Sequence, residues 1–292
     1  MTEDKISRSG QIKNAVSALR KLRPAYAELL DFYEPIFIAQ EEAGLKMDHL
    51  KLEDYQMKTE KNERDFPILS ASVDVRTSAQ LLRKLCEIAE DANKDMAIYA
   101  RNILKGLDTG KIDPNDLFHN FLKDKSSFEK ISDRLEIDKE VFIFMIYNSI
   151  KPCLIRYTEQ ISMPSDKEPE KTGRCPICGS LPSLSTLEGE GGRFLLCSFC
   201  LHKWSVPRMF CPFCEKGDHD TLHYFYAEEE KEYRVDMCDT CKTYIKTVDI
   251  RKMERIFYPP LEQIATLHLD MKAAEMGFFK TVETSPGKLA RD

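Results

Sequence analysis

Four C-x2-C pairs constrain the possible fold of this chain more than any other feature of its sequence. They place eight of the ten cysteines within 67 residues, at Cys175/Cys178, Cys197/Cys200, Cys211/Cys214 and Cys238/Cys241. Two residues between the thiols allow one tight turn to direct both sulfur atoms at a metal ion, and two such turns complete a tetrahedral site. The first residues of the chain have acidic side chains and no signal-peptide apolar run, so we expect a cytoplasmic protein whose paired thiols bind metal.

The two halves of the cysteine-rich region repeat one plan, which predicts how the pairs combine. The sequence CPIC at 175–178 corresponds to CPFC at 211–214, and each is followed by an acidic hairpin tip and a strand that leads into a second pair. We therefore expect two metal ions, one held by the first two pairs and one by the last two. In the alternative, interleaved arrangement, the first pair joins the third and each repeated hairpin is divided between two sites.

A closed four-thiolate site leaves no coordination position for water, so hydrolysis at the metal is not expected. Structural zinc and redox-active iron both fit tetrahedral thiolate ligands, and a metal-free dithiol is the remaining alternative. The residue after the second cysteine of such a turn often has a positive φ, which suits Gly179. At the other pairs Leu201, Glu215 and Lys242 either cost about 1 kcal/mol each or form different turns.

The chain as a whole is predicted to be an α+β protein. Apolar residues recur three and four apart over residues 1–162, which predicts an all-α domain of six or seven helices, with Pro152 kinking or breaking the longest. The polar, proline-containing run at 163–173 is typical of a linker. Two tandem rubredoxin-like or zinc-ribbon β units should follow at 174–209 and 210–255, with a C-terminal helix and tail at 256–292.

Other chemically interesting residues favour structural roles. Cys86 and Cys153 occupy apolar helical positions, where a thiol usually packs as a small hydrophobe. Trp204, the only tryptophan, is expected to pack beside a metal turn. Three histidines could replace a cysteine as ligand but are superfluous beside eight thiols: His202, His219 and His223. No spacing requires an acid–base set from the four residues Asp236, Asp249, His268 and Asp270.

Taken together, these motifs resemble the FdhE-type formate dehydrogenase accessory proteins. The resemblance rests on CPICGS at 175–180, on the segment from Arg193 through Cys200 to Trp204 and Arg208, on CDTCKTYIK at 238–246 and on LHLD at 267–270. It implies a cytoplasmic protein whose eight cysteines are metal ligands in rubredoxin-like sites, for which iron is reported in the family. It also implies a partner, the precursor of the catalytic subunit of formate dehydrogenase.

These observations predict a maturation chaperone without enzymatic activity of its own. A nucleic-acid-binding or transcription-related zinc ribbon is the first alternative, but residues 174–257 have 12 Lys and Arg against 13 Asp and Glu, and the whole chain has a net charge of −6. An electron-transfer protein with thiolate-bound iron is the second alternative. The longest apolar run, from Val141 to Ile155, is interrupted by polar residues and too short to cross a bilayer, so membrane insertion is not expected.

Overall fold

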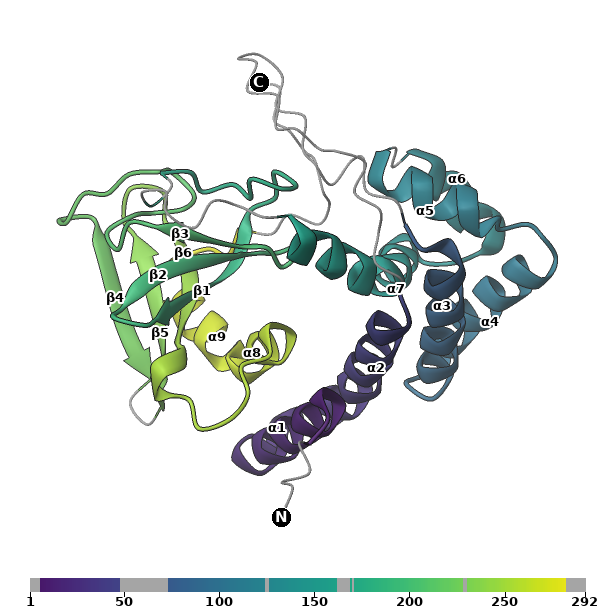
Figure 1. Cartoon of the computed structure of the whole chain (residues 1–292), viewed down its shortest axis with the longest axis horizontal. Coiled ribbons are helices and arrows are strands. Elements are labelled where there is room, and N and C mark those ends of the chain that lie inside the picture. The colour runs from purple at the N-terminus through teal and green to yellow at the C-terminus, as the bar shows by residue number, and fades with distance from the viewer. Residues whose placement is uncertain are drawn as a thin grey trace. The chain divides into compact units, whose positions relative to one another are not determined.

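The computed structural model describes residues 6–47, 73–123, 126–161, 169, 171–227 and 230–281. The chain divides into two compact units, one ending at Gln160 and the other beginning at Ile161 (Figure 1). Most of the predicted linker at 163–173 lies outside the described residues. Each unit is described by itself.

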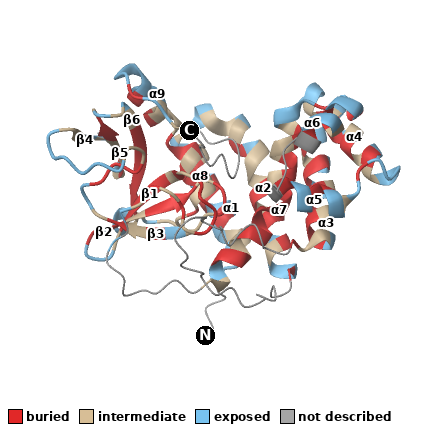
Figure 2. Cartoon of the chain, turned by 90° about the horizontal axis from the view of Figure 1, so that it is seen from above, coloured by how far each residue is buried: buried red, intermediate tan, exposed pale blue. Residues whose placement is uncertain are grey.

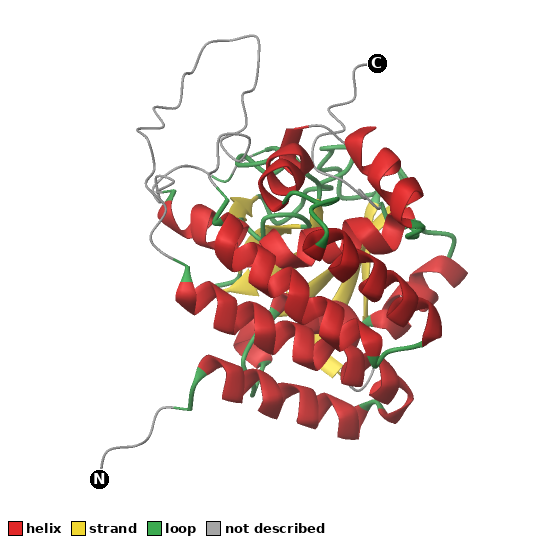
Figure 3. Ribbon diagram, turned by 90° about the vertical axis from the view of Figure 1, so that its right-hand side faces the viewer, coloured by secondary structure: helices red, strands yellow, loops and turns green. Residues whose placement is uncertain are grey.

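The first unit is entirely helical over its described residues. Its helices are α1 (Arg8–Leu22), α2 (Ala27–Lys46), α3 (Val75–Glu90), α4 (Lys94–Asp108), α5 (Pro114–Lys123), α6 (Ser126–Leu135) and α7 (Lys139–Gln160), with a short 3-10 turn η1 (Pro24–Tyr26). Polar side chains cap several helix starts: Asp74 accepts from the Thr77 amide at 2.9 Å, and Asn93 accepts from the Met96 amide at 2.9 Å. Helix α3 packs against α2, α4 and α7, so the helices lie side by side (Figure 3).

Helix α7 supplies a continuous stripe to the core of this unit. Phe142, Ile146, Ile150 and Leu154 recur every four residues and are completely buried (Figure 2). The sequence predicted that Pro152 kinks or breaks this helix. The helix continues through Pro152 to Gln160, so it is not broken there. A proline inside a helix removes one backbone hydrogen bond, and burial of the surrounding stripe offsets this loss.

Both isolated cysteines lie in this helical core. Cys86 on α3 is 0% exposed and Cys153 on α7 is 2% exposed, as the prediction of packed thiols requires. Burial raises the pKa of Cys86 to about 12 and also raises the pKa of Cys153. These thiols therefore stay protonated and behave as apolar side chains.

The second unit contains a six-stranded sheet that joins the two cysteine-rich repeats. Its strands are β1 (Pro182–Glu188), β2 (Gly192–Cys197), β3 (Lys203–Val206), β4 (Leu222–Ala227), β5 (Glu230–Cys238) and β6 (Thr243–Asp249), in the order β3-β2-β1-β6-β5-β4. Each repeat is an antiparallel three-stranded meander. Strands β1 and β6 pair in parallel at the centre, so the two repeats share one sheet.

Two short helices cover one face of this sheet. The predicted C-terminal helix begins at Pro259 as expected but divides at Thr266 into α8 (Pro259–Ala265) and α9 (Leu267–Glu275), while a 3-10 turn η3 (Ile250–Lys252) follows β6. The Tyr233 hydroxyl of β5 donates to the buried Glu262 carboxylate of α8 at 2.7 Å. Side chains alternate between faces along a strand, so Arg234 and Asp236 lie on the face opposite these helices.

The predicted α+β class is confirmed: a helical N-terminal part precedes a sheet region with two four-cysteine groups and C-terminal helices. None of the described helices combines the length and apolar character that a bilayer crossing requires.

Candidate metal centres

The first two C-x2-C pairs bring four thiols together beside the β2–β3 turn. The Sγ atoms of Cys178 and Cys197 are 3.2 Å apart, and that of Cys200 lies 3.6 Å from both Cys175 and Cys178. A tetrahedron of Zn–S bonds of about 2.3 Å has S···S edges of roughly 3.8 Å. The observed separations are close to this value, and all four residues are buried.

The last two pairs form a second group of four thiols beside the β5–β6 turn. The Sγ atoms of Cys211 and Cys241 are 3.6 Å apart, and those of Cys214 and Cys238 are 3.7 Å apart. Cys214 and Cys241 are only partly buried, so this group is nearer to solvent than the first. The thiols thus group as the tandem repeat predicts, and the interleaved arrangement is not formed.

All four pairs use the same turn, whatever residue follows the second cysteine. Gly179 has φ +73°, and Leu201, Glu215 and Lys242 have φ +56°, +59° and +56°. At three of the pairs the amide of this residue donates to the carbonyl of the first cysteine at 2.8 to 2.9 Å, from Gly179, Glu215 and Lys242. The sequence was compatible with two outcomes at the three pairs without glycine: the same turn with a strained residue, or a different turn. The structure shows the same turn, with a non-glycine residue at positive φ in each case.

The environment of the first group suits a cation. Burial raises the pKa of Cys175 and Cys200, whereas hydrogen bonds from Cys175, Cys197 and Cys200 lower the pKa of Cys178. Amides of Phe199 and Cys200 also donate to the Cys197 sulfur at 3.3 and 3.4 Å. A divalent ion at the centre would displace the remaining thiol protons, since metals bind thiolate.

The alternative ligands considered from the sequence lie outside both groups. No histidine among the described residues joins either four-cysteine group. The His223 Nε2 instead lies 2.6 Å from the Asp239 carboxylate. Trp204 is 5% exposed and its indole N–H donates to the Thr172 carbonyl at 3.1 Å, which confirms a packing role.

The four residues considered as an acid–base set belong to separate contacts. Asp236 pairs with Arg234 at 3.0 Å, and Asp249 pairs with Arg251 at 2.7 Å. Asp270 contacts Lys246 at 2.8 Å, whereas His268 lies 3.1 Å from Glu230. The fold therefore assembles no common catalytic group from them.

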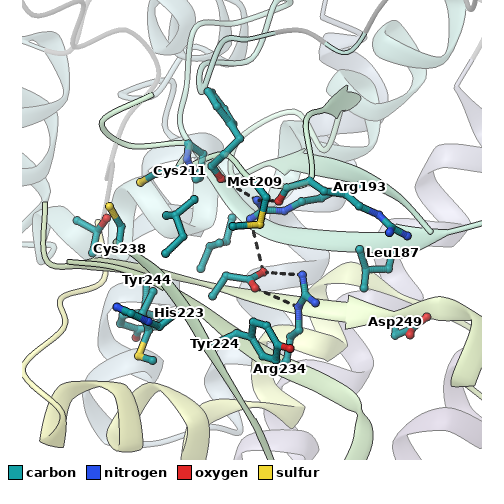
Figure 4. Close-up of a pocket in the computed structure, with 18 of the residues that line it drawn as sticks. Leu187, Arg193, Met209, Cys211, His223, Tyr224, Arg234, Cys238, Tyr244 and Asp249 are labelled. Carbon is teal, nitrogen blue, oxygen red and sulfur yellow. Dashed lines mark hydrogen bonds and ion pairs between the residues drawn. The ribbon is translucent and has the colours of Figure 1, made fainter. Parts of the chain in front are cut away.

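Sequence reasoning missed a cavity that lies between the two repeats on the sheet face opposite α8 and α9 (Figure 4). Several of its charged side chains come from alternating positions of different strands, among them Arg193, Arg234, Asp236 and Asp249. The alternation was visible in the sequence, but only the parallel pairing of β1 with β6 brings these residues to one surface.

The fold and the two cysteine groups define a class of protein: an α+β chain whose second unit presents two closed four-thiol groups that could hold metal ions. Comparison with known proteins finds a similarity that lies mainly in this second unit. Residues 174–208 match the model of the FdhE central domain, and residues 209–284 match the model of the FdhE C-terminal domain. Residues 174–284 are therefore similar to the central and C-terminal domains of FdhE proteins.

Individual relatives show the same similarity. A protein FdhE homolog from Aquifex aeolicus is 35% identical over 165 residues, which cover 54% of this chain and 57% of that protein. Protein FdhE from Escherichia coli is 31% identical over 116 residues, covering 38% of this chain and 37% of that protein. The matched part thus spans little more than half of the Aquifex protein and less of the other.

A solved structure matches over nearly the whole chain. The crystal structure of the FdhE protein from Pseudomonas aeruginosa superposes with a TM-score of 0.64 at 20% identity and covers 96% of each chain. At this identity the match establishes the shared fold.

Proposed function

We propose that this chain is a non-enzymatic, metal-binding accessory protein for the maturation of formate dehydrogenase, and that it binds the precursor of the catalytic subunit. The observation that carries the proposal is the pair of four-thiol groups, whose sulfur atoms lie within 4.8 Å of one another, in the part of the chain that matches the FdhE central and C-terminal domains. Four thiolates complete the coordination of zinc or iron and leave no open position for a substrate. Such metal ions hold a fold together, or transfer single electrons when the metal is iron.

In this proposal the eight grouped cysteines are the metal ligands, four for each ion. Three non-glycine residues in the turns around them adopt a left-handed conformation, which costs free energy. Metal–thiolate bonds supply the free energy that offsets this cost, because a ligand group seldom persists without its metal.

Metal analysis of chain purified without air tests the ligand assignment. We expect two ions per chain in the unaltered protein, and one in either double variant, Cys175→Ser/Cys178→Ser or Cys211→Ser/Cys214→Ser. Cys86→Ala is the matched control, since it removes a thiol that lies in the helical core. It should retain both ions. A visible spectrum of the same samples distinguishes coloured iron–thiolate from colourless zinc. Loss of metal from the control, or full metal content in the double variants, would contradict the assignment.

The partner is tested with a tagged formate dehydrogenase catalytic subunit produced with the full chain. We expect co-purification with the unaltered protein and with Cys86→Ala, and weakened co-purification with both double variants. In cells that lack their own copy of the accessory protein, formate dehydrogenase activity should follow the same order. A metal-loaded chain that neither retains the subunit nor restores activity would overturn the proposed function.

A further inference from the structure

The cavity between the two repeats has the size and lining of a ligand site. Its volume is about 300 Å³, at the lower end of the range of small-molecule pockets. The floor is the sheet face formed by β1, β6, β5 and β4, and the segment from Arg208 to Phe213 forms the opposite wall. The buried Arg193 holds this wall in place, because its guanidinium donates to the carbonyls of Phe210 at 2.7 Å and Arg208 at 3.1 Å.

Positive charge exceeds negative charge in the lining. Two carboxylates, Asp236 and Asp249, face five cationic side chains: Arg193, Arg208, Arg234, Arg251 and Lys252. Asp236 is shared by Arg193 and Arg234, and Asp249 is shared by Arg251 and Lys252. Among these seven side chains, three positive charges remain uncompensated, although the whole chain has a net charge of −6. A concave surface with excess charge of one sign concentrates counter-ions.

Two guanidinium groups converge at one point of the wall. The Nη2 atom of Arg208 lies 1.7 Å, and the Nη1 atom of Arg251 lies 3.1 Å, from the point that a Cβ on Gly191 would occupy. Arg251 binds Asp249 through Nε and Nη2, so its Nη1 is the atom on the side of Arg208. Among the described residues, the hydrogen bonds of Arg208 are to the carbonyls of Gly191 and Glu190. Two guanidinium groups this close together can donate hydrogen bonds to different oxygens of one anion, such as a phosphate. We call them the guanidinium pair.

Aromatic rings form the neighbouring part of the surface. Tyr224 and Tyr226 are 59% and 45% exposed, and their ring centroids are 5.5 Å apart in an edge-to-face arrangement. Arg234 lies over the ring of Tyr224 at 5.1 Å, and Lys252 lies over the ring of Tyr226 at 5.5 Å. A flat ring can stack on such a surface beside the cations.

The second cysteine group lies beside one end of the cavity. Figure 4 shows Cys211 and Cys238 at one end of the cavity and Leu187 and Asp249 at the other. A divalent ion held there by four thiolates would give the group a net charge of about −2, which would repel an anion. The anionic group is therefore expected near Arg208 and Arg251, beside Asp249.

We propose that this cavity binds a small molecule that combines a phosphate group with a flat ring, of which a nucleoside phosphate is the simplest example. The phosphate contacts Arg208 and Arg251, and the ring packs against the surface formed by Tyr224 and Tyr226. A compact, partly open cavity with a guanidinium pair and adjoining aromatic rings suits such a molecule better than an extended acidic peptide, which needs a longer groove. This proposal is independent of the role in formate dehydrogenase maturation.

Isothermal titration calorimetry of the metal-loaded full chain with ADP, AMP, adenosine and pyrophosphate tests the proposal. We expect saturable binding of ADP and AMP, weaker binding of pyrophosphate, and none of adenosine alone. Raising the salt concentration should weaken binding, because screening acts on the charged contacts. Arg208→Gln and Arg251→Gln should each weaken ADP binding about tenfold, and Tyr224→Leu about fivefold.

Lys272→Gln is the matched control, since it removes one positive charge from an exposed site on α9 outside the cavity. It should leave ADP binding unchanged. A thermal unfolding transition followed by Trp204 fluorescence shows whether each variant is folded, and Arg208→Lys retains the charge if Arg208→Gln unfolds. Absence of saturable binding by ADP and AMP, or equal binding by Arg208→Gln, Arg251→Gln and the control, would overturn the proposal. So would binding of a hexaglutamate peptide without binding of ADP, which would indicate an acidic protein segment as the occupant.

Discussion

At the scale of single residues, the turns that hold the cysteines require a backbone conformation that their side chains disfavour. Leu201, Glu215 and Lys242 have positive φ angles, although a left-handed residue with a Cβ costs roughly 1 to 2 kcal/mol. Local contacts offset only a small part of this cost. Glu215 accepts a hydrogen bond from the Gly173 amide at 2.9 Å, and the Lys242 ammonium contacts Asp239 at 2.7 Å. The turn geometry is therefore imposed by the sulfur positions rather than by residue preference.

Lys242→Gly should stabilise the second unit by up to about 1 kcal/mol, because the left-handed strain that glycine removes outweighs the exposed ion pair with Asp239 and the contact of the ammonium with the Phe278 ring. Gly179→Ala should destabilise the unit by about 1 kcal/mol for the opposite reason. Urea unfolding of the metal-loaded chain, followed by the fluorescence of Trp204, measures both changes. Lys171→Gly is the control, since Lys171 has no positive φ. A stabilisation by this control equal to that by Lys242→Gly would contradict the argument.

At the scale of elements, a buried lysine joins strand β6 to the C-terminal helices. The Lys246 side chain is 1% exposed and its ammonium lies 2.8 Å from the Asp270 carboxylate of α9. It also donates to the carbonyls of Gln263 and Thr266 at 3.2 and 3.4 Å. The Tyr244 hydroxyl donates to the other Asp270 oxygen at 2.8 Å. Burial outweighs the attraction of Asp270 and lowers the pKa of Lys246 to about 8.

This lowered pKa predicts how stability depends on pH. Between pH 8 and about 10.4 the unfolded chain keeps the Lys246 proton while the folded chain loses it, so the free energy of unfolding rises with pH. From pH 7.5 to 9.5 we expect Lys246 to contribute a rise of about 2 kcal/mol. Lys246→Met should lack this rise. The difference between the two chains in urea unfolding isolates the effect from Tyr233 and Tyr244, whose pKa values are raised by burial. Parallel pH profiles of the two chains would contradict the assignment.

The elements also show how far the sequence could predict the fold. Helices with a continuous apolar stripe, such as α3 and α7, follow from spacing alone. The four-cysteine groups follow from spacing and repetition, because local turns determine most of their geometry. The parallel pairing of β1 with β6 could not be predicted, since it joins segments about sixty residues apart and depends on packing rather than on a local signal. The cation-lined cavity depends on that pairing. The net charge of residues 174–257 is close to zero, so it gave no sign of a local excess of positive charge.

At the scale of the whole molecule, the two units are stabilised by different means. The helical unit buries large apolar side chains such as Phe118, Phe128 and Phe142, and all of its described cysteines are isolated core thiols. The second unit places eight of its residues in the two thiol groups, and its apolar core is shared between a single sheet and two short helices. In the proposed metal-bound state, the ions stabilise only this second unit, because they bind its folded form.

Removal of metal should therefore separate the two units in an unfolding experiment. In the chelated full chain we expect the cooperative transition of Trp204 fluorescence to disappear, while most of the circular dichroism at 222 nm retains its transition because α1 to α7 lie in the other unit. Readdition of the ion should restore the Trp204 transition, which distinguishes loss of metal from irreversible damage. An apo chain that keeps the Trp204 transition at its original temperature would show that the sheet folds without metal. A simultaneous loss of both signals would show that the helical unit depends on the metal-bound unit.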